Sequence, residues 1–205
     1  MSFSRSTTSR GYDLIGDVHG HADALTTLLA EMDYARNQYG GFTHSANRQA
    51  VFVGDLVNRG PKIRETLQIA RKMVESGSAL VILGNHELNV LGMETNGADG
   101  LPLRPHTRQN CIQSSRTKSA FRDYPGEWSE NLAWIRTLPL SLELEGLRIV
   151  HAVWHPPSLE IIAGRNFEDG SFLRSAFTRK TPEEIATGIT LKGIKVPLPL
   201  NKAYR

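Results

Sequence analysis

The sequence predicts an α/β fold, because one pattern occurs three times in succession. In each case a short apolar run ends at a turn that contains glycine and a polar residue, and a segment with helical signals follows. Strands that alternate with helices in this order form a parallel sheet with right-handed crossovers. The 205 residues, of which 40% are hydrophobic and 22% charged, suffice for one domain with a substantial core.

The first two repeats each include a complete predicted helix. The third repeat contributes the turn Gly84–Glu87, whose polar residues belong to the candidate site. Leucines at helical spacing predict an amphipathic helix in the first repeat, and Pro61 suits the first turn of the second helix. A loop rich in glycine and asparagine separates these two repeats at 37–47. The predicted strands are 12–15, 50–53 and 79–83, the turns are Gly16–Gly20, Gly54–Gly60 and Gly84–Glu87, and the helices are 22–33 and 61–76.

The pattern then becomes irregular. Residues 92–126 carry glycine, proline, asparagine and arginine without a clear period, and we expect an insertion that forms a lid, a binding loop or a disordered segment. The remaining predictions are a disordered tail at 1–10, a helix at 127–138, a β-hairpin with strands 140–145 and 147–150, a helix after Thr181 as N-cap and an extended segment at 194–200. We therefore expect a tail and one domain, 11–205.

Composition excludes several classes of protein. The formal charge of +3 is spread along the chain, and no concentrated basic face with aromatic residues predicts nucleic-acid binding. The single cysteine, Cys111, excludes an internal disulfide framework and fits a reducing compartment. No stretch is apolar and long enough to predict a membrane span or a secretory signal. The expectation is a cytoplasmic enzyme without a membrane or nucleic-acid partner.

Polar residues at the predicted strand ends form a candidate metal site. Carboxylate, amide and imidazole ligands suit divalent first-row metals, and the lack of thiolates argues against a structural zinc site. Asp17 and His19 can face one ion, Asp55 can bridge two ions, and Asn85 and His151 can hold the second. Two ions about 3.5–4 Å apart activate a water and hold a phosphoryl group. A lone Gly-Asp turn is usually structural, but three such turns behind three strands favour a site.

Two further residues are candidates for the chemistry itself. Arg59 can neutralise phosphate oxygens with its fork of donors. His86, which follows Asn85, is the candidate acid for the leaving oxygen. We therefore expect Arg59, Asn85 and His86 to contact the phosphate.

The four motifs Gly16–Gly20, Gly54–Gly60, Gly84–Glu87 and Val150–Ala152 resemble those of the calcineurin-like metallophosphoesterases. The resemblance is strongest to the branch with serine/threonine phosphoprotein phosphatases and diadenosine tetraphosphate hydrolases. It implies a two-sheet α/β sandwich flanked by helices (α/β/β/α), with the metal ligands assigned above. It also implies direct attack of a metal-bound hydroxide on phosphorus, with Arg59 holding the phosphate and His86 as general acid.

Two departures from this resemblance bear on mechanism. Phosphoprotein phosphatases usually have aspartate where this chain has Asn58, and that aspartate supports the acid histidine. Asparagine can accept a hydrogen bond from His86 but lacks the charge that stabilises imidazolium, so we expect a lower pKa of His86 than with aspartate. The family also has a histidine ligand in a Gly-His turn near the C-terminus, and no Gly-His pair follows His151. We expect a truncated or naturally short chain, or replacement of that ligand by His155 or a water.

The sequence thus predicts a metal-dependent phosphoesterase with two divalent ions, most favourably Mn²⁺, with iron, zinc, nickel or cobalt as alternatives. A phosphomonoesterase of the phosphoprotein-phosphatase type is slightly preferred over a dinucleoside polyphosphate hydrolase, so the substrate is a phosphoprotein or a nucleotide. A non-catalytic protein that binds metal or phosphate is the rival from another class. The basic residues of the insertion either bind a polyphosphate or phosphopeptide or form a solvated loop; they are Arg104, Arg108, Arg116 and Lys118.

Overall fold

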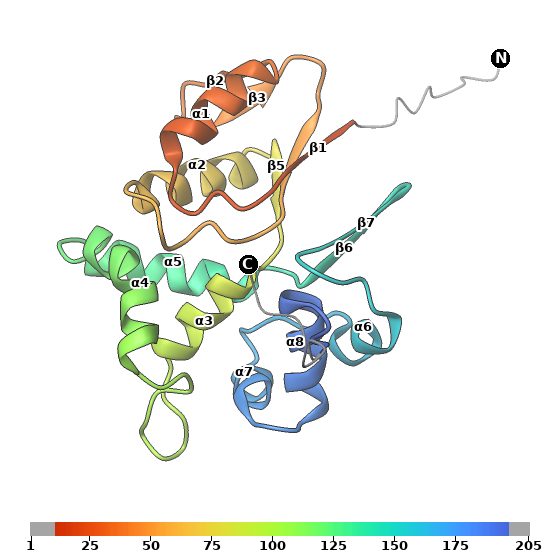
Figure 1. Cartoon of the computed structure of the whole chain (residues 1–205). Helices are drawn as coiled ribbons and strands as arrows, with labels where there is room; N and C mark the ends of the chain where they lie inside the picture. Colours follow the sequence, from red (N-terminus) through yellow and green to blue (C-terminus); the bar gives the residue numbers. More distant parts are fainter. Residues whose placement is uncertain (1–10, 197–205) are drawn as a thin grey trace, which may run out of the picture.

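The computed structural model describes residues 11–196, and the expected N-terminal tail lies outside this range. A three-stranded parallel sheet in the order β1-β4-β5 forms its centre (Figure 1). Strands β4 and β5 are short, mostly apolar and largely buried, as expected for strands covered on both faces, whereas the edge strand β1 has Asp13 and the exposed Leu14. The elements of this half are β1 (Tyr12–Ile15), α1 (Ala22–Glu31), β2 (Tyr34–Arg36), β3 (Phe42–His44), β4 (Gln49–Phe52), α2 (Ile63–Glu75), β5 (Ala79–Val81) and α3 (Asn85–Met93).

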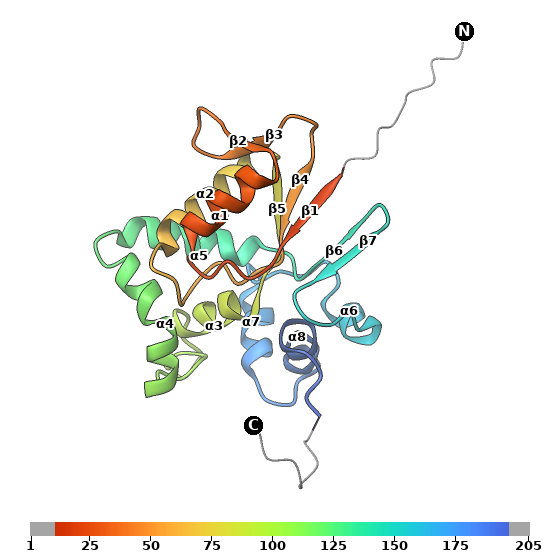
Figure 2. The ribbon, with the colours of Figure 1, turned by 45° about the horizontal axis from the view of Figure 1, so that its top comes forward.

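The two faces of this sheet are covered differently. Helices α1 and α2 lie on one side, and the β6–β7 hairpin lies on the other (Figures 1 and 2). A small apolar cluster with Val51, Ile82 and Ile149 joins the hairpin to the sheet, while the main core lies between the sheet and the helices. The predicted α/β fold with two facing sheets is therefore confirmed, although each sheet is small. The remaining elements are α4 (Arg108–Ala120), α5 (Pro125–Thr137), β6 (Ser141–Leu144), β7 (Leu147–Val150), α6 (Pro156–Ile162), α7 (Gly170–Phe177) and α8 (Pro182–Lys192).

The parallel arrangement brings the carboxyl ends of β1, β4 and β5 to one edge. The turns that follow β1 and β4 are joined by backbone hydrogen bonds from His19 N–H to Asp55 C=O and from Gly20 N–H to Leu56 C=O. The third turn leads directly into α3, whose first residue is Asn85. Polar turns that are distant in sequence thus meet where open α/β sheets bind ligands.

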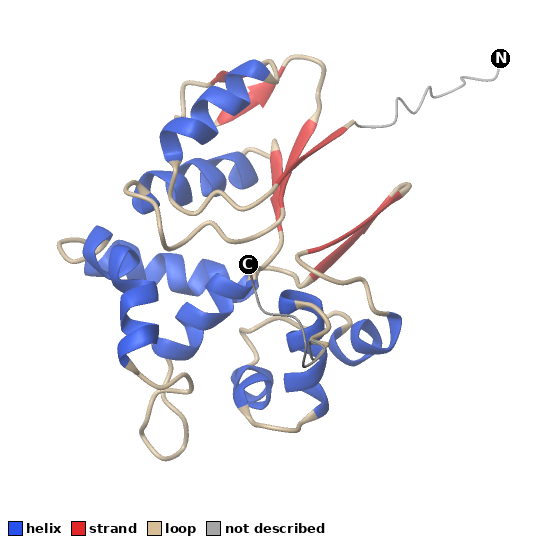
Figure 3. Cartoon of the chain, viewed as in Figure 1, coloured by secondary structure: helices blue, strands red, loops and turns tan. Residues whose placement is uncertain are grey.

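Some expectations about the elements were wrong. The loop expected at 37–47 contains β3, which pairs with β2 as an antiparallel hairpin of three residues per strand. The irregular segment expected at 92–126 contains α4 (Figure 3), whose buried residues are Ser114 and Thr117. This helix has no apolar stripe, so periodicity could not reveal it. Its N-cap Thr107, which accepts a hydrogen bond from Asn110 N–H, was the available signal.

The C-terminal region also contains more helix than expected. Pro156 and Pro157 occupy the first turn of α6, where a missing amide hydrogen has no cost, so both prolines are compatible with the start of this helix. Helix α8 begins after Thr181, whose hydroxyl accepts a hydrogen bond from Glu184 N–H, as predicted. Of the segment expected to be extended at 194–200, residues 197–200 lie outside the described range. Among the described helices, none is both long and apolar enough to cross a membrane.

Candidate metal centre

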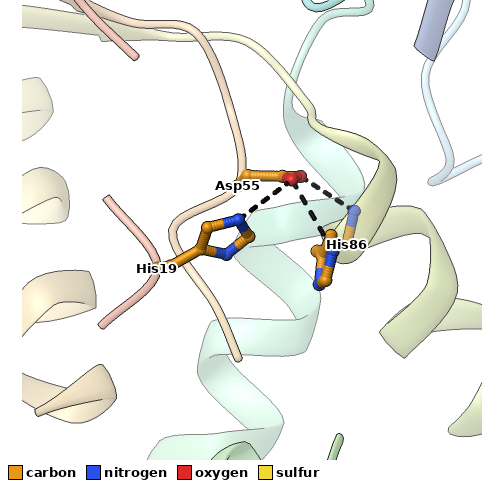
Figure 4. A group of neighbouring side chains, drawn as sticks. All are labelled: His19, Asp55 and His86. Carbon is orange, nitrogen blue, oxygen red and sulfur yellow. Dashed lines mark hydrogen bonds and ion pairs between the residues drawn. The ribbon is translucent and has the colours of Figure 1, made fainter. Parts of the chain in front are cut away.

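The carboxylate of Asp55 lies at the centre of the candidate site and is 2% exposed. Its Oδ2 atom lies 3.5 Å from His19 Nε2 and 3.8 Å from His86 Nε2 (Figure 4). Its Oδ1 atom lies 3.7 Å from His151 Nε2 and accepts a hydrogen bond of 2.9 Å from the backbone N–H of His86. The two oxygens of one carboxylate therefore face different histidines.

His19 is held so that one ring nitrogen is free to bind a cation. Its Nδ1 atom lies 2.9 Å from the carbonyl oxygen of Val57, which can only accept, so Nδ1 carries the proton. Nε2 is then a lone-pair atom. It is buried without a hydrogen-bond partner among the described residues, and it lies 3.7 Å from Asp17 Oδ2. A buried lone pair between two carboxylates is the arrangement expected of a metal ligand with a backbone carbonyl behind it.

His151 repeats this arrangement from β7. Its Nδ1 atom lies 2.6 Å from the carbonyl oxygen of Val53, which leaves Nε2 as an acceptor. That atom lies 3.0 Å from Asn85 Oδ1, which is also an acceptor. Two acceptors at this distance repel each other unless a positive group lies between or beside them. A divalent cation ligated by both atoms satisfies them, so the residues present fit a metal ion.

Two clusters in the described part of the chain have the composition and spacing of metal sites. One consists of His19, Asp55 and His86, and the other of Asp17, Asp55 and His151. Asp55 belongs to both. The structure thus brings all the predicted carboxylate and histidine ligands together. The grouping differs from the expected one, because His86 lies with His19 and Asp55, and Asp17 lies with Asp55 and His151.

The backbone around Asp55 is strained and is held by a buried acid. Asp55, Asn58 and Arg59 have φ values of 55°, 68° and 63°, in the left-handed region that non-glycine residues seldom adopt. The carboxylate of Glu87 accepts hydrogen bonds from the backbone N–H groups of Asp55, Leu56 and Val57, at 2.8, 2.8 and 3.1 Å. These bonds fix the turn that presents Asp55 to the site.

The sequence did not assign this role to Glu87. The side chain is fully buried and also accepts a hydrogen bond from Gly84 N–H. Burial, with a further contribution from the charge of Asp55, raises the pKa of Glu87 to about 7. A Cβ atom on Gly84 would lie 2.3 Å from Asp55 N, so glycine is required for the two turns to approach. The role of Glu87 could have been recognised from its place three residues after Gly84 at a helix start, which is the spacing of a capping box.

Asn58 contacts His86 in a way that differs from the sequence expectation. Thr117 Oγ1 accepts from the backbone N–H of Asn58 at 3.0 Å, and its hydroxyl then donates to Asn58 Oδ1 at 2.8 Å. The amide oxygen is therefore occupied, and Asn58 Nδ2 lies 2.9 Å from His86 Nδ1. Asn58 donates to His86 instead of accepting from it. This hydrogen bond favours a neutral imidazole with its proton on Nε2.

The electrostatics around His86 act in the same direction. Burial lowers the pKa of His86, and the charges of His19 and Arg59 lower it further, while Asp55 opposes them. Gln113 Nε2 on α4 lies 3.5 Å from His86 Nε2, so the helix missed by the sequence borders this ring. Both atoms carry hydrogen in this assignment and form no hydrogen bond with each other, and the shorter contact from Asn58 decides where the ring proton lies. Arg59 itself is exposed beside the site.

His155 does not join either cluster. It is the N-cap residue of α6, and its Nδ1 atom lies 2.8 Å from Ser158 Oγ on the same helix. The structure therefore gives no support to His155 as the replacement for the missing histidine ligand.

These features agree with the family to which the chain is matched. The calcineurin-like phosphoesterase family model matches residues 12–185, and the chain belongs to this family. The residues of the two metal clusters come from four places in this chain. These are the turns after β1, β4 and β5 and the end of β7.

Among its relatives are two kinds of bis(5'-nucleosyl)-tetraphosphatase. The symmetrical enzyme of Neisseria meningitidis is 33% identical over 155 residues, which cover 73% of this chain and 47% of that protein. The asymmetrical enzyme PrpE of Oceanobacillus iheyensis is 42% identical over 74 residues, which cover 36% of this chain and 29% of that protein. The chain thus spans about half or less of the length of these curated relatives.

A solved structure confirms the fold. The cold-active protein-tyrosine phosphatase of a psychrophilic Shewanella species has a TM-score of 0.52 and 18% sequence identity, and the match covers 90% of this chain and 56% of that one.

Proposed function

We propose that this chain is a phosphoesterase that uses two divalent metal ions. The observation that carries the proposal is the placement of Asp55, whose Oδ2 faces His19 and whose Oδ1 faces His151. One carboxylate that serves two clusters is what a pair of bridged ions requires. In this proposal Asp17, His19 and Asp55 would hold one ion, since His19 Nε2 lies 3.7 Å from Asp17 Oδ2. Asp55, Asn85 and His151 would hold the other, since His151 Nε2 lies 3.0 Å from Asn85 Oδ1. Such ions would lower the pKa of a bound water and neutralise phosphoryl oxygens.

The residues around the clusters bind and orient the phosphate. Arg59, exposed beside the site, offers a guanidinium fork to phosphoryl oxygens. Neutral His86 can donate a hydrogen bond from Nε2 to the leaving oxygen, because Asn58 donates to its Nδ1 atom, and it would transfer a proton to that oxygen only as imidazolium. Asn58 is a positioning residue in this scheme, and Thr117 fixes the orientation of its amide. The backbone of the Asp55 turn, held by Glu87, keeps these groups in place without substrate.

For the substrate we propose a dinucleoside polyphosphate. The names of the relatives, symmetrical and asymmetrical bis(5'-nucleosyl)-tetraphosphatase, support this choice over the phosphoprotein that the sequence slightly favoured. The metal we propose is Mn²⁺, because mixed carboxylate, amide and imidazole ligands without thiolates suit it.

The test is a substrate panel measured with Mn²⁺ on three proteins. We expect the wild-type chain to cleave a dinucleoside tetraphosphate faster than a phosphoserine peptide, with p-nitrophenyl phosphate as a general probe. Asp55→Asn should lower all turnover by about 100-fold or more, since it weakens both ion sites. Asp123→Asn, which removes an exposed carboxylate after α4, is the matched control and should be unchanged. Binding of one ion per chain without turnover would instead support a non-catalytic metal-binding protein.

A further inference from the structure

A cavity near the metal centre is lined by more positive than negative side chains. It is a cavity of about 520 Å³ between α3, the segment 103–110 and helix α8. A volume in this range is typical of sites for small organic ligands. Its walls include Leu88 on α3, Ile189 on α8 and Phe177 at the end of α7, and it also contains Arg104, Lys192 and Lys195. We call it the Arg104 cavity.

Arg104 is a partly buried cation that is held only by neutral groups. Its guanidinium donates to the side-chain oxygens of Asn89, Asn110 and Gln113, at 2.7, 2.8 and 3.1 Å. Its Nε atom is buried and has no hydrogen-bond partner in the described part of the chain. Burial lowers the pKa of Arg104, which reflects the cost of placing this charge there. The fork is thus fixed in orientation but carries no counter-charge.

The other cations of the cavity add to this imbalance. Within residues 11–196, no ion pair includes Arg104, Lys192 or Lys195. Burial and the nearby charges of Arg104 and Lys195 lower the pKa of Lys192, against a smaller opposing effect of Glu184. Glu184 is the only acid that lines the cavity in the described structure, and it accepts a hydrogen bond from Lys180 N–H at the start of α8. Three cations against one acid favour an anionic occupant.

The cavity is also close to the metal centre. Leu88 and Asn89 lie within about one turn of Asn85 and His86 on α3. Gln113 contacts both Arg104 and His86, at 3.1 and 3.5 Å. The guanidinium of Arg104 is therefore two contacts away from the imidazole beside Asp55.

We propose that the Arg104 cavity binds a nucleoside phosphate, as the distal part of the substrate whose phosphoryl group lies at the metal centre. Lys192 and Lys195 take phosphate oxygens, the partly buried charge of Arg104 adds to the attraction for the anion, and the apolar walls pack against the base. This role as a substrate subsite rests on the proposed function, whereas binding of a nucleotide in the cavity does not. Inorganic phosphate alone would use the cations but leave most of the volume and the apolar walls without contact.

The test compares two double variants with matched loss of charge. Lys192→Gln/Lys195→Gln removes the two lysines of the cavity, and Arg179→Gln/Lys180→Gln removes two exposed cations before α8. Calorimetry with ADP as probe, on the full chain with and without Mn²⁺, should show binding that is weakened about tenfold or more in the first variant only. Arg104→Gln should act in the same direction, but it also breaks three hydrogen bonds, so the lysine pair is the decisive variant.

The outcomes are distinct. The nucleotide site would be refuted by any of three results. These are no binding of ADP, binding of ADP that the lysine variant leaves unchanged, and equal affinity for ADP and inorganic phosphate. In turnover of a dinucleoside tetraphosphate, the lysine variant should raise KM with little change in kcat, and p-nitrophenyl phosphate turnover should be unchanged. Absence of all turnover in the wild-type chain would refute the proposed function, while the ADP measurement would still decide the cavity.

Discussion

Replacement of Asn58 by aspartate should raise the pKa of His86. In the wild-type chain Asn58 Nδ2 lies 2.9 Å from His86 Nδ1 and favours the neutral ring, and burial lowers the pKa of His86 in the same direction. A carboxylate at position 58 would instead accept a hydrogen bond from the protonated Nδ1 of His86. Thr117 can still donate to its second oxygen, so the network survives with the opposite polarity.

The size of the effect follows from the contact distance. At 2.9 Å the carboxylate and imidazolium form a charge-assisted hydrogen bond, which exceeds a neutral one by about 1–2 kcal/mol. One pKa unit corresponds to about 1.4 kcal/mol, so the bond alone raises the pKa of His86 by about 1 unit. Loss of the donor that stabilised the neutral ring adds to this, and we expect a total of about 1–2 units.

The assay is an NMR titration of isotope-labelled histidine in the metal-free chain. The His86 midpoint should rise in Asn58→Asp and stay constant in Asn96→Asp, which adds the same charge on an exposed loop. The limb of the pH–rate profile that reports His86 should move to higher pH by the same amount. A midpoint that falls, or that moves no more than in the control, would refute the assigned direction of this hydrogen bond.

Three further outcomes test the surroundings of the site. Glu87→Gln should lower the free energy of unfolding by about 3 kcal/mol in urea titrations, because one amide oxygen cannot serve four N–H donors; a loss below about 1 kcal/mol would contradict this. Gly84→Ala should weaken Mn²⁺ binding measured by calorimetry, because the added Cβ would lie 2.3 Å from Asp55 N. An added Cβ at Gly126 in α5 would meet no atom within 4 Å, so the control Gly126→Ala should raise the free energy of unfolding by about 0.5 kcal/mol. The Asp169 carboxyl should titrate by NMR at about 2, below its ordinary 3.8, because the Ser171 hydroxyl and two backbone N–H groups hold its charge; its stabilising effect is present above 3.8 and is lost as the pH falls towards 2. Ser171→Ala should move that midpoint upward, and an unchanged midpoint would be evidence against the bond.

The sequence predicted which side chains converge where polar turns follow apolar strands. Asp17, Asp55 and His151 are far apart in sequence, yet their ligand atoms lie within 4.8 Å of one another. Parallel pairing of β1, β4 and β5 is what brings the turns to one edge, and that pairing follows from the three strand–turn–helix repeats.

Other features were not predicted because they depend on tertiary contacts. Helix α4 buries polar residues, Ser114 and Thr117, so its sequence has no apolar face to detect. The orientation of Asn58 depends on Thr117, which lies 59 residues further along the chain. The Arg104 cavity likewise requires α8 to pack beside α3, which no local pattern indicates.

The number and spacing of bound ions is the most direct test of the central claim that Asp55 is shared between two metal positions. The chain should bind two Mn²⁺ ions, and their electron paramagnetic resonance spectrum should show the coupling of a pair about 3.5–4 Å apart. Asp55→Asn should abolish that coupling. Two uncoupled ions, or a single ion per chain at saturation, would contradict the account.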